Sequence, residues 1–460
     1  DGLNTIIPVR NDIYYQSRPT IAIQRNEAIL LDDDTGLHPA MQSLRPLWDN
    51  DQMAVVHNVG YERSTRSHFE GTVNWVTGRD QGTGEGTGWA GRYLADEFYD
   101  DSTPLEYPLA VRVGSAPATL FQSDYGNLSV TFTDSQQFER FIDQGGYYDP
   151  HNVPATVYGE TLSFVRSVTN ASYRYVESVQ QAASQAANLG AYPGGNLASS
   201  LAVVARLIRG QLGSRVFAVS QSGFDTHSDQ GGAQGSHANR LGSIADAVAA
   251  FMADLATDGL DQKVLVMTFS EFGRTLVENG SRGTDHGAGA PLMLFGSGLA
   301  GGLYGTQSTL QPGDLYGGDP RYTTDYRDVY HTLLKDWFGL PSDRVVDIMG
   351  RSFNNLGFVS DPTNVSRDED DVPTAFRLEQ NYPNPFNPAT QIRYTLSQSG
   401  TVRLGIYDVQ GRLVRTLANQ TQPPGTHTVA FDGTDLPSGT YLYRLETSAG
   451  TQTRRMVLVK

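Results

Sequence analysis

The sequence predicts a large α/β domain followed by a small all-β domain. Residues 1–360 alternate short apolar runs with helical patterns, which is typical of an α/β domain with a mostly parallel sheet flanked by helices. From residue 375 onward the pattern changes to short strands with period-two alternation. At 460 residues the chain is also too long for one compact core, so we expect two or more domains.

Five short aliphatic runs are the candidate strands of the first domain, and each is followed at once by Gly, Ser, His or acidic residues. In open α/β sheets, ligands bind beyond the carboxyl ends of the strands, so we expect a site there. The expected strands are 53–59, 109–113, 215–220, 263–268 and 291–295, and the expected helices are 158–188, 197–212, 238–258 and 326–338.

Residues 361–374 are predicted to be an acidic linker, because they hold the run Asp-Glu-Asp-Asp, two prolines and no apolar period. A solvated spacer is favoured there over a calcium site. Gly, Pro, Asn and Asp turns then separate alternating runs, which predicts an Ig-like sandwich over 375–460 without a catalytic cluster. Its expected strands are 391–396, 401–407, 427–431, 440–446 and 454–459.

Composition argues against some classes of partner and limits which residues can bind a metal. A formal net charge of -16 argues against nucleic acid as a partner, because phosphate binding needs a basic surface. No apolar run approaches the roughly 18 residues of a membrane-spanning helix, so no transmembrane segment is expected. The chain has no cysteine, so any metal must bind to Asp, Glu, His or backbone oxygens.

Four short motifs mark the end of the chain: LEQNYPNPFNP at 378–388, IYDVQGR at 406–412, LPSGTY at 436–441 and MVLVK at 456–460. Together they resemble the C-terminal sorting domain of the bacterial type IX secretion system. The resemblance implies that the protein crosses the outer membrane and is released or attached to the cell surface, with the secretion machinery as its partner. It leaves open whether this domain is retained in the mature protein.

Four polar clusters fall at the expected strand ends. They are DGLN at 1–4, RSHF at 66–69, FDTH at 224–227 and SEFGR at 270–274, with TDHG at 284–287 just beyond the fourth. Carboxylates and imidazoles at neighbouring strand ends suit one or two divalent ions, whether zinc, manganese, magnesium or calcium. The residues alone do not fix which metal binds.

The order of these clusters resembles the alkaline phosphatase and sulfatase superfamily, and more closely an exported bacterial family within it that is a domain of unknown function. The resemblance implies an alkaline-phosphatase-like sheet and a nucleophilic serine assisted by metal. It implies these roles: Ser67 as nucleophile, Arg66 or Arg274 as the group that neutralises developing charge, and Asp1, Asp225, His227, Glu271, Asp285 and His286 as metal ligands. Nothing precedes Asp1 here, so the expected first strand is either absent from this sequence or removed by processing.

Simpler roles compete with these. Ser67 is followed three residues later by Glu70, a capping box that is worth about 1 kcal/mol. His57 is expected to pack in a strand of the core. His38 and His237 are expected at the surface, although His237 is close enough to FDTH to support the site.

Two functions from different classes follow. The first is a secreted metal-dependent hydrolase of phosphate or sulfate esters. The alternative is a non-catalytic extracellular surface or filament-forming protein that keeps the hydrolase fold and self-assembles at the cell surface. A third reading, carbohydrate binding, depends only on aromatic residues that are expected to be exposed: Trp89, Tyr147 and Tyr148. The sequence leaves open whether the protein is an enzyme.

Overall fold

The computed structural model describes residues 1–79, 86–99, 105–144, 154, 156, 175–360, 377–378, 381, 384, 386–396, 398–423, 425–448 and 450–460. The expected acidic linker, residues 158–174 of the first expected helix, and Tyr147 and Tyr148 lie outside these residues. The chain divides into two compact units. The first unit is Asp1–Tyr99 with Leu105–Val365, and the second is Asp100–Pro104 with Ser366–Lys460.

A mixed sheet forms the centre of the first unit, in the order β10-β11-β4-β12, with β15 also paired to β4. Its strands are β4 (Met53–Gly60), β10 (Val266–Met267), β11 (Ala290–Phe295), β12 (Gly302–Tyr304) and β15 (Thr324–Asp325). Strands β12 and β15 run parallel to β4, whereas β11 runs antiparallel to both β4 and β10. The fold is therefore mixed α/β, and the alkaline-phosphatase-like sheet stays a prediction.

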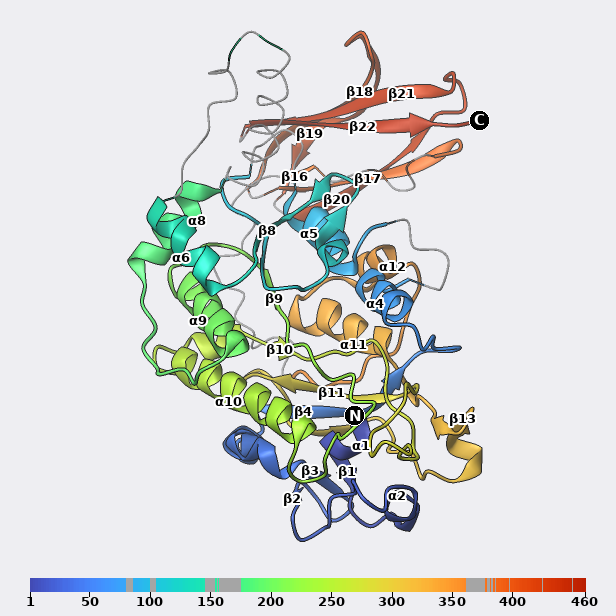
Figure 1. The fold of residues 1–460 in the computed structure, drawn as a ribbon. Helices are drawn as coiled ribbons and strands as arrows, with labels where there is room; N and C mark the ends of the chain where they lie inside the picture. The colour runs from blue at the N-terminus through green and yellow to red at the C-terminus, as the bar shows by residue number, and fades with distance from the viewer. Residues whose placement is uncertain are drawn as a thin grey trace. The chain divides into compact units, whose positions relative to one another are not determined.

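Helices cover both faces of this sheet, because successive side chains of a strand point to opposite faces. Ala54 and Val56 of β4 pack in one core with α4 (His68–Thr77), α5 (Trp89–Phe98), α11 (Tyr326–Thr332) and α12 (Ser342–Met349). Met53 and Val55 pack in another core with α9 (Asn196–Arg209) and α10 (Ser236–Ala256). Figure 1 shows α9 and α10 side by side. The first unit is thus a layered α/β/α structure.

A second, parallel sheet has the order β8-β5-β9, formed by β5 (Ala110–Val113), β8 (Ser129–Phe132) and β9 (Val216–Val219). Val111 and Val113 pack against α9 and against α6 (Ser135–Gln144) and α8 (Val176–Gln185). The loop that follows β9 reaches the candidate site described below.

The other elements of the first unit are short. They are α1 (Gly2–Thr5), β1 (Ile6–Pro8), α2 (Asp12–Ser17), β2 (Ile29–Leu30), β3 (Thr35–Leu37), η1 (Pro39–Leu44), α3 (Arg45–Asp49), η2 (Ala118–Phe121), β6 (Gln122–Ser123), β7 (Gly126–Asn127), η3 (Leu260–Lys263), η4 (Pro312–Asp314), β13 (Leu315–Tyr316), β14 (Asp319–Pro320) and η5 (Leu333–Trp337). Strands β1, β3 and β2 form a small antiparallel sheet, and η5 is a π-helix that continues α11.

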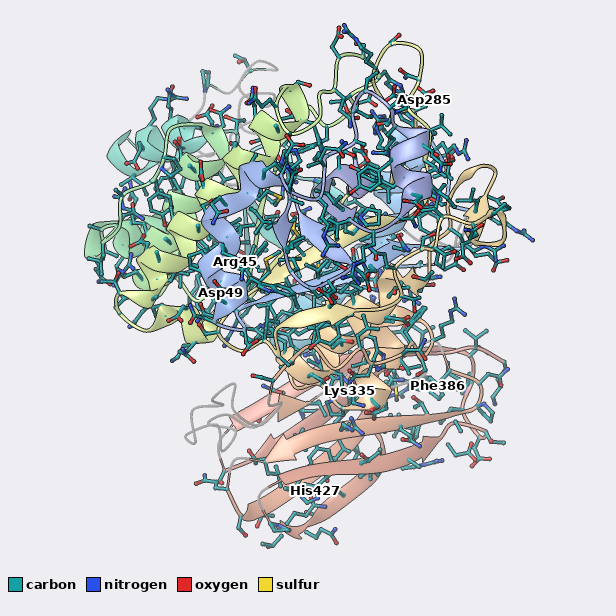
Figure 2. All side chains as sticks on the ribbon, turned by 90° about the horizontal axis from the view of Figure 1, so that it is seen from below. Arg45, Asp49, Asp285, Lys335, Phe386 and His427 are labelled. Carbon is teal, nitrogen blue, oxygen red and sulfur yellow. The ribbon has the colours of Figure 1, made fainter. Side chains whose placement is uncertain are left out.

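The second unit is all-β, with antiparallel sheets in the orders β16-β17-β20 and β19-β18-β21-β22. Its strands are β16 (Arg377–Leu378), β17 (Ala389–Leu396), β18 (Gly400–Asp408), β19 (Leu413–Gln422), β20 (Gly425–Asp432), β21 (Gly439–Thr447) and β22 (Gly450–Leu458). Both sheets contribute to one core, where Ile392 and Tyr394 of β17 share a cluster with Leu404 and Ile406 of β18. Phe386, labelled in Figure 2, is buried in the same cluster.

Most expected strands and helices appear near their expected positions, but several elements were not expected, among them α5, α12, β12 and β19. The sequence of β19, LVRTLANQTQ, lacks strict alternation, and most of its side chains are exposed or half-buried. Among the residues that the structure describes, no helix combines the length and the apolar character needed to cross a membrane.

Candidate functional site

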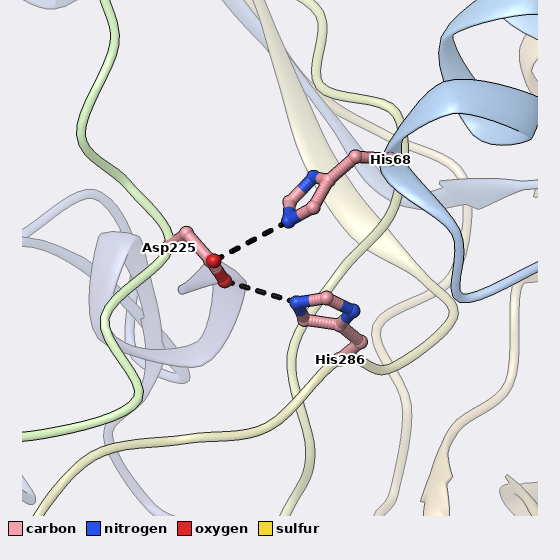
Figure 3. Close-up of side chains that lie close together, drawn as sticks. All are labelled: His68, Asp225 and His286. Carbon is pink, nitrogen blue, oxygen red and sulfur yellow. Dashed lines mark hydrogen bonds and ion pairs between the residues drawn. The ribbon is translucent and has the colours of Figure 1, made fainter.

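Three segments of the first unit meet at one site. His68 is the first residue of α4, and Asp225 and His227 lie in the loop after β9. The connection between β10 and β11 carries Glu271 and His286. Figure 3 shows the side chains of His68, Asp225 and His286 directed toward one another. We call His68, Asp225, His227 and His286 the His–Asp cluster.

Asp225 lies at the centre of the His–Asp cluster. Its Oδ1 is 2.9 Å from Nε2 of His227, from Nε2 of His286 and from Nη1 of Arg274. Its Oδ2 is 3.5 Å from Nε2 of His68. Within the described part of the chain, His68, Asp225 and His286 form the group whose ligand atoms all lie within 4.8 Å of one another. The carboxylate of Asp225 is therefore surrounded by nitrogen atoms.

The Nδ1 atom of each imidazole in the cluster, opposite the Nε2 that faces Asp225, contacts an oxygen atom. The pairs are Nδ1 of His68 with Oε1 of Glu271 at 2.5 Å, Nδ1 of His227 with Oδ1 of Asp285 at 2.8 Å, and Nδ1 of His286 with the carbonyl oxygen of Arg66 at 2.8 Å. Ionised carboxylates and carbonyls only accept hydrogen bonds, so each Nδ1 carries a proton and donates it. When the imidazoles are neutral, each Nε2 then presents a lone pair to Asp225.

This convergence of lone pairs fits a divalent metal ion. Nε2 of His227 is also 3.0 Å from Nε2 of His286, so two lone pairs face each other beside an ionised carboxylate. A cation relieves that repulsion, and imidazole nitrogens with a carboxylate are the donor set that zinc and related ions prefer. Ligand histidines in metal sites commonly donate their other N–H to a carboxylate, as His68 does to Glu271 and His227 does to Asp285.

Neighbouring groups keep two carboxylates of the site, Asp225 and Asp285, ionised. Partial burial acts to raise the pKa of Asp225. The hydrogen bond that Nε2 of His286 donates when its imidazole is protonated at both nitrogens, together with the charge of Arg274, outweighs burial and lowers that pKa to about 2. Hydrogen bonds from His227 and Asn279 lower the pKa of Asp285. Carboxylates that stay ionised are ready to bind a cation over a wide range of pH.

The site is open to solvent. The side chains of His68, Asp225 and His227 are nearly half exposed. Asp285 is more exposed still, and Figure 2 places it at the surface of the first unit. A dissolved substrate or ion can therefore reach the cluster.

Ser67 begins the helix that carries His68. It is the N-cap of α4, and its Oγ accepts a hydrogen bond from the backbone N–H of Glu70 at 3.4 Å. The capping role expected from the sequence is thus confirmed. The structure gives Ser67 no hydrogen bond to the His–Asp cluster, so a nucleophilic role stays a prediction.

The two arginines and Asp1 have separate positions. The guanidinium of Arg66 pairs with Asp319, and only the carbonyl of Arg66 contacts the cluster. Arg274 is buried and binds Asp225, and burial lowers its pKa. The carboxylate of Asp1 forms an ion pair with the buried Arg18 at 2.6 Å. Three of the predicted ligands, Asp225, His227 and His286, lie together in the cluster. Glu271 and Asp285 contact the Nδ1 atoms of His68 and His227 instead. Asp1 pairs with Arg18 outside the cluster.

His68 is the member of the cluster that sequence reasoning did not assign. Its signal was its place in RSHF, directly after Ser67, at a helix start where a side chain can face the strand ends. Two other expectations were wrong. His38 and His237 are fully buried, because η1 and α10 pack against each other, and Trp89 is buried in the core of the first unit. His57 is buried in β4, as expected.

Two family models match the chain. Residues 166–349 match a family described as protein of unknown function (DUF1501), and residues 380–460 match one described as secretion system C-terminal sorting domain. The second match confirms the expected sorting domain, which implies a type IX secretion system and a cell-surface or secreted location. A search of curated proteins found no match.

Three solved structures show limited similarity. They are dimeric latent PorU from Porphyromonas gingivalis (24% identity, 18% of this chain and 9% of that chain, TM-score 0.16), PorZ, a surface component of the type IX secretion system of the same organism (19%, 23% and 14%, TM-score 0.15), and an engineered protein (13%, 57% and 45%, TM-score 0.20). The chain spans less than half the length of each of these three chains.

Proposed function

Since this chain joins a DUF1501 segment to a type IX secretion sorting domain, we propose that it is an exported metal-dependent hydrolase of phosphate or sulfate esters. The observation that carries the proposal is the convergence of three imidazole Nε2 atoms on the carboxylate of Asp225 at an open site. Lone pairs held this close to one another and to an ionised carboxylate repel, and a bound cation would relieve that repulsion.

His68, Asp225 and His286 would hold the ion, with His227 as a further donor beside them. When bound, a divalent ion polarises an ester oxygen as a Lewis acid and stabilises developing negative charge. Glu271 and Asp285 orient two of the imidazoles through their hydrogen bonds. The site thereby has ligands and the groups that position them.

The start of α4 supports an anionic substrate. A helix N-terminus presents backbone N–H groups and a partial positive charge, which favour a phosphate or sulfate oxygen. Ser67 caps this ten-residue helix directly before His68. A serine hydroxyl is a weak nucleophile unless a base or a metal ion activates it, and an ion held beside His68 would supply that activation to Ser67 for attack on an ester.

The test combines metal content with hydrolysis. Full-length protein purified without chelator should contain about one equivalent of zinc or a related divalent ion. It should also hydrolyse 4-nitrophenyl phosphate or 4-nitrophenyl sulfate. Asp225→Asn should lose both the ion and the hydrolysis. Asp229→Asn is the matched control, because Asp229 lies in the same loop and pairs with the exposed Arg282.

Metal-free wild-type protein that stays folded, hydrolyses neither ester and gains nothing from added zinc would contradict the proposal. That result would favour the surface-assembly alternative, whose own check is the size of the protein at high concentration.

A further inference from the structure

Gln230 connects two loops of the site from inside the protein. It is fully buried and lies five residues after Asp225. Its Oε1 is 2.9 Å from Oγ1 of Thr226 and 2.8 Å from Oγ1 of Thr284. Its Nε2 is 2.6 Å from Oδ2 of Asp1. One amide group thus makes three buried hydrogen bonds.

The partner of the amide nitrogen fixes how the group is oriented. The carboxylate of Asp1 pairs with Arg18 and accepts hydrogen bonds, so the atom that faces it must be the amide N–H₂ of Gln230. The amide oxygen then faces the hydroxyls of Thr226 and Thr284, and both hydroxyls donate to it. No aliphatic side chain of the same length can accept these two protons.

The two threonines adjoin the candidate ligands. Thr226 lies between Asp225 and His227, and Thr284 precedes Asp285 and His286. Both hydroxyls bind the same oxygen atom of Gln230, and this shared contact fixes the distance between the two loops. The contact lies next to the four site residues named above, two on each loop. Neither threonine belongs to the His–Asp cluster.

Backbone contacts show how closely the two loops approach. The N–H of Thr284 donates to the carbonyl of Thr226 at 3.1 Å, and the N–H of Gln230 donates to that of Arg282 at 3.0 Å. A Cβ at Gly283 would lie 2.3 Å from the carbonyl carbon of His227, so no side chain fits there. The loops are in direct contact, and Gln230 joins their buried side.

We propose that Gln230 is a positioning residue: its amide oxygen, shared by Thr226 and Thr284, sets the relative placement of the loops that carry Asp225, His227 and His286. The inference rests on the proposed metal site but names a residue that touches none of its four donors. Loss of this oxygen leaves two buried hydroxyls without their acceptor, and the loops shift to find other partners.

The test uses the full chain and two readouts. Gln230→Met keeps the length of the side chain but removes the acceptor, together with the amide N–H₂ that donates to Asp1; Thr284→Val below tests the acceptor contact by itself. We expect its affinity for Co²⁺ or Zn²⁺, measured by competition with a chelating dye, to fall roughly tenfold or more, as for other groups that orient metal ligands. In the metal-free protein we expect faster hydrogen exchange over residues 281–286, where the amide of Thr284 is bonded across the loops.

Three further variants separate positioning from general stability. Thr284→Val removes one of the two hydroxyls and should weaken metal binding, whereas Thr284→Ser keeps the hydroxyl and should restore it. Thr332→Val is the matched control, because Thr332 is fully buried in α11 and its hydroxyl donates to the carbonyl of Asp328 at 2.8 Å. It should lower the unfolding temperature but leave metal affinity unchanged.

Metal affinity within twofold of wild type in folded Gln230→Met and Thr284→Val, together with unchanged exchange over residues 281–286, would overturn the inference. Equal loss of affinity in Thr332→Val would overturn it as well. Ester hydrolysis by the wild-type protein is a separate readout. Wild type that binds the ion but hydrolyses no ester refutes the hydrolase proposal and leaves the positioning role standing.

Discussion

Glu271 and His68 are 203 residues apart in the sequence, and Oε1 of Glu271 lies 2.5 Å from Nδ1 of His68. The carboxylate fixes the tautomer of this imidazole and turns its Nε2 toward Asp225. It also places the end of one strand against the start of α4. The contact therefore joins two segments of the site and sets the electronic state of a candidate ligand.

Glu271→Gln should weaken metal binding without removing it. The amide oxygen can still accept from Nδ1 of His68, but the negative charge that makes the imidazole a stronger donor is lost. We expect metal affinity to fall by roughly tenfold, and by more in Glu271→Ala, measured by dye competition. Equal affinity in Glu271→Gln, Glu271→Ala and wild type would show that this carboxylate does not orient the ligand.

Ser67 can be tested for its two roles separately. Asn is as good an N-cap as Ser but has no hydroxyl. Ser67→Asn should therefore keep the stability of α4 while ester hydrolysis disappears. Ser67→Ala should lose about 1 kcal/mol of unfolding free energy as well as the hydrolysis. Hydrolysis at the wild-type rate in Ser67→Asn would remove the serine from the reaction and leave it as a cap only.

Asp254 makes the stability of the first unit depend on pH. It is fully buried, and although burial acts to raise its pKa, hydrogen bonds from Asn188 and Tyr192 outweigh this and lower it. A carboxyl with a lowered pKa stabilises the folded state above its ordinary pKa of about 4, and the contribution is lost as the pH falls through the folded value.

Urea unfolding of wild type should accordingly show a falling free energy below about pH 4. Asp254→Asn should cost about 2 kcal/mol at pH 7, because it removes the charge of a buried carboxylate that accepts hydrogen bonds from Tyr192 and from the backbone N–H of Leu189, whereas Arg209 keeps its ion pair with Asp258. The variant should also show a shallower decline at low pH. Parallel pH curves for the two proteins would contradict this assignment.

Tyr443 in the second unit offers a local test of the sandwich. Its side chain is fully buried, and its hydroxyl accepts a hydrogen bond from the backbone N–H of the buried Asn381 at 2.7 Å. Tyr443→Phe should cost about 1.5 kcal/mol by removing this acceptor. Hydrogen exchange over β21 in the full chain should be faster. Tyr316→Phe, at a half-exposed tyrosine of the first unit, is the control that should leave β21 unchanged.

The sequence located the candidate site better than it located the sheet. Asp225 and His227 follow the apolar run of β9, and Glu271 follows that of β10, so the strand ends indicated the site although the two strands belong to different sheets. The sequence of a strand does not indicate whether it runs parallel or antiparallel to its neighbour. The run at 291–295 is equally apolar in either direction, and only the structure shows that β11 runs antiparallel to β4.

The role of each polar side chain was harder to predict than its neighbourhood. Glu271 and Asp285 are acidic residues in the right segments, so both were assigned to the metal. In the structure each of these carboxylates contacts the Nδ1 of a histidine and not the position where an ion would bind. Loop conformation decides between these two arrangements, and the sequence does not give it. His68 was not assigned a role, because the function of RSHF was attributed to Ser67, as nucleophile or as helix cap.

The reversed direction of β11 also bears on how an ion would enter and leave. Strands β10 and β11 pair with each other, with Met267 opposite Leu294, so their pairing closes the segment between these two residues, which carries Glu271 and His286. The entropy of closing this segment is lost when the sheet forms, before any ion arrives. Exchange of the proposed ion would then need no unfolding, unlike small domains that fold only around their metal. Uptake of that ion outside the cell would follow secretion as a separate, reversible event.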